Sequence, residues 1–176
     1  MAVPKGSPCA VPIASYQHGT SSTKTGVPGF QSQESLIGIL LASTGYLCIL
    51  PDYIGLGGSP GMHPYVHADT EALAVIDMIR SAREFIEDDP LRLNEQIFLF
   101  GYSQGGHATM AAHKMIQEEF SDEMWVTASN PMSGPYDISG VQTDILLSGE
   151  PYATPSYLPY VMLGYQAVYD LSLIHI

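Results

Sequence analysis

Ser103 is the residue whose surroundings most clearly predict chemistry. It lies in the turn Gly101-Tyr-Ser-Gln-Gly105, after an apolar run at 96–100 and before a stretch of helical spacing at 107–120. A serine between a buried strand and a helix in a G-x-S-x-G turn forms a nucleophile elbow, which presents the hydroxyl on a sharp corner. We expect Gly101 and Gly105 to be needed because strand and helix meet there without room for a Cβ atom. The pattern predicts Ser103 as a catalytic nucleophile.

A second G-x-S-x-G pattern occurs around Ser59, in Gly57-Gly-Ser-Pro-Gly61. The residue after Ser59 is Pro60, which has no N–H and cannot act as the oxyanion donor that an elbow requires at that position. Ser59 also lies in a loop rich in glycine and proline, several residues past the nearest predicted strand. Context, and not the motif alone, therefore favours Ser103 over Ser59.

Attack by a serine on an acyl group needs two N–H donors for the developing oxyanion, one directly after the nucleophile and one from another loop. Gln104 supplies the first by its position. The loop His18-Gly19-Thr20 follows the predicted strand 11–17, and we expect Thr20, or failing that Gly19, to supply the second. The alternative is a hydrophilic turn in which His18 only caps the strand.

Apolar strand-like runs alternate with helical periodicity along the chain, which is typical of a parallel sheet with crossover helices. The sequence predicts an α/β fold with a doubly wound, mostly parallel sheet and helices on both faces. Active sites of such sheets lie at the carboxyl ends of the strands, where Ser103 is placed. The expected strands are 11–17, 46–50, 96–100 and 124–129, and the expected helices are 33–44, 68–85 and 107–120.

Two of these helices have a predicted apolar face. The residues expected to face the core are Leu36, Ile37, Leu40 and Leu41 in the first helix, and Leu73, Ile76, Met78 and Ile79 in the second. Acidic and basic residues at the ends of the second helix, Asp69, Glu71, Arg80 and Arg83, fit the helix dipole.

Charge and composition narrow the classes of partner. The 18 acidic and 6 basic residues give a net charge of -12, which argues against nucleic acids and anionic membrane surfaces as partners. No apolar run is long enough for a transmembrane segment. Cys9 and Cys48 do not form a disulfide framework. A small-molecule substrate of uncharged or acyl character fits this composition best.

Three motifs in matching order carry a family resemblance: the loop His18-Gly-Thr20, the loop Pro51-Asp-Tyr-Ile-Gly-Leu-Gly-Gly-Ser-Pro-Gly61, and the elbow. Together, over about 11–140, they resemble the α/β-hydrolase superfamily, and within it the secretory lipase and esterase family of bacteria and fungi. The resemblance implies a Ser-His-Asp triad that hydrolyses carboxylic esters or lipids without a metal or organic cofactor. It also implies a secreted or periplasmic protein, although these residues contain no signal peptide. We interpret Asp52 as structural.

The chain departs from the family after the nucleophile, because the triad acid and histidine should follow on later strands. His107 and His113 lie on the helix that runs away from the strand ends. Asp170 and His175 are too close in sequence for loops of two adjacent parallel strands, which need a crossover of about a dozen residues. Asp137 is a weak candidate for the acid. We expect the acid and the histidine to lie beyond this chain, which alone should be inactive.

The resemblance implies a partial hydrolase core at 1–147 and a cap or lid at 148–170, a segment that is rich in tyrosine. Residues 171–176 resemble translated sequencing adapter and are expected to be a non-native tail. An apolar, tyrosine-rich cap would line an acyl-binding cleft. The alternative for 148–170 is a core helix.

Other functions remain open at this point. An acyltransferase or a peptidase of the same superfamily would keep every residue named above. A module that binds phosphate at the helix N-terminus is a different class. It is disfavoured because no lysine or arginine adjoins Gly101–Gly106.

Overall fold

A four-stranded parallel sheet forms the centre of the molecule. The computed structural model describes residues 1–87 and 89–171. The strands follow the spatial order β2-β1-β3-β4, so the chain winds from the middle of the sheet outward on both sides. This is the predicted doubly wound α/β fold. The strand bounds are β1 (Val11–Gln17), β2 (Leu47–Ile49), β3 (Leu93–Tyr102) and β4 (Ala128–Met132).

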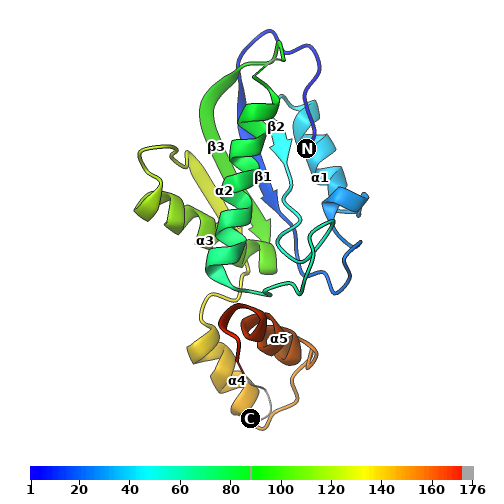
Figure 1. Cartoon of the computed structure of the whole chain (residues 1–176), viewed down its shortest axis with the longest axis vertical. Helices are drawn as coiled ribbons and strands as arrows, with labels where there is room; N and C mark the ends of the chain where they lie inside the picture. Colours follow the sequence, from blue (N-terminus) through cyan, green and yellow to red (C-terminus); the bar gives the residue numbers. More distant parts are fainter. Residues whose placement is uncertain (88, 172–176) are drawn as a thin grey trace.

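Helices cover both faces of this sheet, as Figure 1 shows. One face packs against α2 (Ala68–Phe85) and α3 (Gln104–Glu119), and the other packs against α1 (Ser35–Ser43). Alternation along the strands separates the two cores, because successive side chains point to opposite faces. The α2 and α3 face receives Ile13, Leu47, Ile49, Ile97 and Leu99, and the α1 face receives Tyr16, Cys48 and Phe100.

The remaining elements lie outside the sheet. A short 3-10 turn, η1 (Pro28–Phe30), precedes α1, and a π-helical turn, η2 (Ile138–Gln142), leads into α4 (Thr143–Leu147). With α5 (Tyr157–Tyr169), α4 forms a small layer beyond the ends toward which the strand arrows point (Figure 1). Among the described residues, no helix combines the length and the apolar character that crossing a bilayer requires.

The predicted cap segment, 148–170, therefore contains α5 and lies at the carboxyl edge of the sheet (Figure 1). Its role as a cap stays a prediction. Of the predicted tail, Leu171 is described, whereas residues 172–176, with His175, lie outside the described part of the chain.

The fourth strand was predicted too early, at 124–129. Pairing with β3 begins at Ala128, opposite Phe98, and continues to Met132, opposite Tyr102. Met124 is buried against the core and belongs to the connection that follows α3. Met124 and Val126 of this connection pack against the core, whereas Trp125 is exposed. The strand itself is a more polar run that lies beside β3 up to the elbow.

The apolar faces of two helices were also predicted too broadly. In α1, Leu36 is 60% and Leu40 is 66% exposed, whereas Ile37 and Leu41 pack against the sheet. In α2, Leu73 is 38% exposed. Positions one residue apart on a helix point about 100° apart, so a run of adjacent apolar residues cannot all face one sheet.

Candidate active site

The backbone of Ser103 adopts a conformation that L residues rarely take, with φ 59° and ψ -121°. Ser103 is the residue between β3 and α3. Its N–H donates to the carbonyl of Met132 at 2.9 Å, and its own carbonyl accepts the N–H groups of Gly106 and His107 at 2.9 and 3.2 Å. These bonds hold a partly exposed serine on a sharp corner at the carboxyl edge of the sheet.

Three glycines make this corner possible. A Cβ atom on Gly101 would overlap the carbonyl oxygens of Gly105 and Gln17, and one on Gly105 would overlap the Gln17 carbonyl. The expectation that Gly101 and Gly105 leave no room for a side chain is confirmed. Gly106 adds a third such position, because its Cβ would meet the carbonyl oxygen of Met132.

The backbone N–H groups of Gln104, the first residue of α3, and of Thr20 have no acceptor among the described residues. The N–H of Gly19 is occupied, since it donates to Oε2 of Glu34 at 3.1 Å. Of the two residues predicted for the second oxyanion donor, Thr20 is thus the one whose N–H is free. Its hydroxyl hydrogen-bonds the hydroxyl of Tyr65 at 2.9 Å.

His18 and Asp52 hold the loops around this corner. The His18 ring is 1% exposed and lies between the carbonyl oxygens of Gly19 and Asp52, at 2.7 and 3.3 Å from its two nitrogens. It packs against Tyr53, whose hydroxyl donates to the His18 carbonyl at 3.0 Å. Oδ1 of Asp52 accepts the N–H of Gly29 at 2.8 Å. The role of Asp52 is structural, as expected, and His18 orders the loop that carries Thr20.

A buried polar network that the sequence did not predict lies behind the elbow. Nε2 of Gln104 donates to Oε1 of Glu71 at 2.7 Å and to Nε2 of His63 at 2.6 Å. His63 can accept there because its Nδ1–H donates to the Ile54 carbonyl at 2.8 Å. Burial lowers the pKa of His63 and favours this neutral ring. Nδ1 of His107 lies 2.7 Å from Oε2 of Glu71.

The position of Glu71 in the sequence already indicated that it would be buried, which the interpretation as a helix-dipole charge missed. Its spacing from Val75 and Ile79 places it on the buried stripe of α2, and its side chain has no exposure to solvent. A carboxylate in that place requires partners, because burying an unpaired charge is strongly unfavourable. His63 lies in a loop and had no comparable signal.

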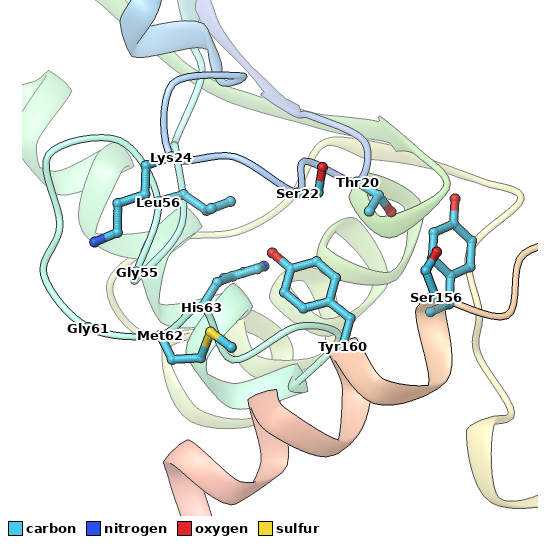
Figure 2. Close-up of a pocket in the computed structure, with 11 residues that line it drawn as sticks. Thr20, Ser22, Lys24, Gly55, Leu56, Gly61, Met62, His63, Ser156 and Tyr160 are labelled. Carbon is cyan, nitrogen blue, oxygen red and sulfur yellow. The ribbon is translucent and has the colours of Figure 1, made fainter.

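A cavity of about 330 Å³ opens beside Thr20 (Figure 2). Its walls come from the loop after β1, the loop that contains His63, and the start of α5. The hydroxyl of Tyr160 donates to the Ser21 carbonyl at 2.8 Å, and its ring stacks on Tyr65 with 4.3 Å between centroids. Ser103 does not line this cavity, but Thr20 and His63, the partner of Gln104, do.

A second cavity, of about 260 Å³, is lined by Tyr65 and by residues of α4 and α5. Most of its lining is apolar or aromatic, with Pro135 from the segment after β4 and Val161 from α5. Tyr157 lines both cavities, and its ring contacts that of Tyr65, which lines the second.

Among the described residues, no histidine ring is hydrogen-bonded to the Ser103 hydroxyl. Nδ1 of His107 is paired with Glu71, and Nδ1 of His113 lies 2.8 Å from the Ser129 hydroxyl. Asp137 caps η2 with both oxygens, which accept the N–H groups of Gly140 and Val141 at 2.9 and 3.2 Å. Asp170 ends α5 with φ 51°. The described residues therefore do not assemble a triad around Ser103.

Comparisons with known proteins agree with this architecture. The model of the secretory lipase family matches residues 21–143. A solved structure from Legionella pneumophila is 33% identical, with a TM-score of 0.84 over 97% of this chain and 46% of that chain. The rice cell wall degrading esterase LipA from Xanthomonas oryzae is 32% identical, with a TM-score of 0.81 over 97% of this chain and 47% of that one.

Candida antarctica lipase A shares the fold at 21% identity, with a TM-score of 0.60 over 95% of this chain and 38% of that chain. No curated protein matches the chain. The chain spans slightly less than half the length of the Legionella and Xanthomonas proteins. With the family model matched over more than half of its residues and the sheet, helices and glycine-lined elbow in place, the chain belongs to the secretory lipase family of α/β-hydrolases.

Proposed function

We propose that this chain carries the nucleophile of a carboxylic ester hydrolase that works through an acyl-enzyme. The observation that carries the proposal is the backbone of Ser103, held at positive φ between Gly101 and Gly105 with the free N–H of Gln104 directly after it. A strained serine beside an unpaired donor is what nucleophilic attack on an acyl carbon requires.

In the proposed reaction, Oγ of Ser103 forms a bond to the ester carbonyl carbon and passes its proton to a histidine. The N–H groups of Gln104 and Thr20 stabilise the oxyanion, and loss of one such donor typically lowers the rate about 100-fold to 1,000-fold. The C–O bond to the alcohol then breaks, and the histidine returns the proton to the leaving oxygen. Water attacks the acyl-enzyme by the same route and releases the acid.

We place the histidine and its acid partner outside the described part of the chain, because each described histidine ring is hydrogen-bonded to a residue other than Ser103. This agrees with the order Ser, acid, histidine in α/β-hydrolases. Neither the attack nor the hydrolysis calls for a metal or an organic cofactor.

The proposed substrate is a small-molecule ester or lipid. Two cavities with aromatic walls border the loops around the elbow, and such lining suits an acyl chain. A chain with a net charge of -12 repels anionic substrates. The Xanthomonas relative, described as an esterase, supports the same class.

The test is active-site labelling of the protein expressed from its complete reading frame. A fluorophosphonate probe should label the wild type and Ser59→Ala but not Ser103→Ala, and the first two should turn over p-nitrophenyl esters. Labelling that persists in Ser103→Ala would refute the assignment. Transfer of the acyl group to an added alcohol or amine in preference to water, or cleavage of peptides, would instead favour an acyltransferase or a peptidase.

A protein limited to residues 1–171 should not turn over these esters, because none of its described histidine rings is hydrogen-bonded to the Ser103 hydroxyl. Ester turnover dependent on Ser103 in that shortened protein would show that its base lies within these residues.

A further inference from the structure

We propose that Glu71 is a positioning residue for the oxyanion donor, acting through the side chains of Gln104 and His107. This inference rests on the proposed function of Ser103 and Gln104. It assigns a role to a buried carboxylate on a different helix from the nucleophile.

The position of Glu71 is the first observation. It lies in the first turn of α2 with a side-chain exposure of 0%, and its two oxygens face three donors. The Val66 N–H, at 3.2 Å, comes from the loop just before α2. Nε2 of Gln104 and Nδ1 of His107, each at 2.7 Å, come from the first turn of α3. One carboxylate therefore fixes the turn of α3 that directly follows Ser103.

The amide of Gln104 is the second observation. Both of its hydrogens are used, one by Glu71 and one by His63, so the side chain has a single orientation. Its Oε1 is buried and has no partner among the described residues. Buried carbonyl oxygens normally accept a hydrogen bond. The exception at Gln104 indicates that the two bonds donated by its NH₂ group determine the orientation of the side chain.

His107 provides the other end of the same turn. Its backbone N–H donates to the Ser103 carbonyl at 3.2 Å, while its ring is held by Glu71. The N–H of Gln104 lies between these two anchors and has no acceptor of its own. The backbone of this turn therefore sets the direction of the Gln104 N–H, and Glu71 fixes that backbone by accepting hydrogen bonds from the side chains of Gln104 and His107.

Packing between the two helices does not by itself need a charge. Ala72 and Val75 of α2 and Ala112 of α3 belong to one fully buried apolar cluster. Replacing a buried ionic group by an apolar one is often neutral or stabilising, so stability alone is a weak reason for a carboxylate at position 71. The hydrogen bonds of Glu71 to Gln104 and His107 instead support a role in orienting the elbow.

The experiment compares Glu71→Gln with wild type in the protein from the complete reading frame. With p-nitrophenyl butyrate, kcat should fall about 10-fold to 100-fold, as for a displaced oxyanion donor, while KM changes less than threefold. The rate of fluorophosphonate labelling at Ser103 should fall by the same factor. His113→Gln is the matched control, because it replaces a histidine on the same helix that contacts Ser129 instead of Glu71, and its kcat should stay at the wild-type value.

A double-mutant cycle separates positioning from a general loss of stability. Gln104→Met keeps the backbone N–H and removes both side-chain bonds, so it should also lower kcat. The double variant with Glu71→Gln should be no slower than the slower single variant, whereas Glu71→Gln with His113→Gln should show multiplied effects. If Glu71→Gln does not fold, the kcat of Gln104→Met alone decides.

Wild-type kcat in folded Glu71→Gln, or in Gln104→Met, would overturn the inference. So would fully multiplied effects in the cycle with Gln104. These results differ from failure of the proposed function, in which the wild type itself would not be labelled at Ser103.

Discussion

Backbone atoms, more than side chains, determine the surroundings of Ser103. Carbonyl oxygens of Gln17, Gly105 and Met132 fill the space that side chains on the three elbow glycines would occupy. The motif could be recognised from the sequence because its own residues are consecutive in the chain, although Gln17 and Met132 belong to β1 and β4. Glu71 and His63 could not be assigned in that way, because the partner they share, Gln104, lies more than 30 residues away along the chain.

Gly105→Ala should lower the free energy of unfolding by about 3 kcal/mol, the upper range for overpacking, because the new Cβ overlaps the Gln17 carbonyl. Urea unfolding monitored by circular dichroism measures this. Gly58→Ala is the control, since nothing lies within 4 Å of its added Cβ, and its effect should stay within about 0.5 kcal/mol. Equal stability of the two variants would contradict the crowding seen at Gly105.

At the scale of elements, periodicity predicted α2 and β1 with the observed bounds, because each has a strong pattern of buried positions. It misplaced β4, whose polar residues pair with β3 only because the register continues to the elbow. It also placed Leu36 and Leu40 in the core, whereas α1 meets the sheet through a narrower stripe. Which residues of a strand pair, and which residues of a helix face the sheet, depend on the neighbouring element. The sequence of one segment alone does not determine them.

Contacts of α5 give a prediction at this scale. Tyr160→Ala removes the stack on Tyr65 and the hydrogen bond to Ser21, which border the loop of Thr20. Tyr160 also lines the first cavity, and an aromatic contact with the acyl group worth about 0.5–1.5 kcal/mol would be lost, so KM for p-nitrophenyl octanoate should rise about twofold to tenfold. Tyr169→Ala, on the same helix but lining neither cavity, should leave KM unchanged. The same rise in both variants would argue against contact between the substrate and the Tyr160 end of α5.

For the whole molecule, the alternation of strands and helices predicted the doubly wound parallel sheet with helices on both faces. The strand order β2-β1-β3-β4 came from the structure. The site is less complete than the fold. Neither a base nor an acid lies against Ser103 in the described residues, and the sequence order of the family's triad had already indicated this.

Burial of Cys48 couples the stability of the whole molecule to pH. Burial raises its pKa from 9.0 to about 12. In the unfolded chain the thiol ionises near pH 9, while in the folded protein it stays protonated, so the free energy of unfolding should fall as pH rises from 9 toward 12, by up to about 1.4 kcal/mol per pH unit. Urea unfolding at pH 8, 9.5 and 11 measures the decline.

Cys48→Ala should make this decline shallower, whereas replacing the exposed Cys9 by alanine should leave it unchanged. An unchanged slope in Cys48→Ala would contradict the assignment. Tyr65, whose pKa burial also raises to about 12, contributes a decline of the same sign in both variants.

The positive φ of Ser103 has a consequence for how this lineage could lose its chemistry. A glycine would relax a conformation that strains any L residue by about 1–3 kcal/mol, so Ser103→Gly should unfold at higher urea than Ser103→Ala, although both are inert. Selection for stability alone would therefore favour glycine at this position. If position 103 had no catalytic role, stability would favour Gly-Tyr-Gly there, so a strained serine at this position is what the proposed nucleophile role predicts.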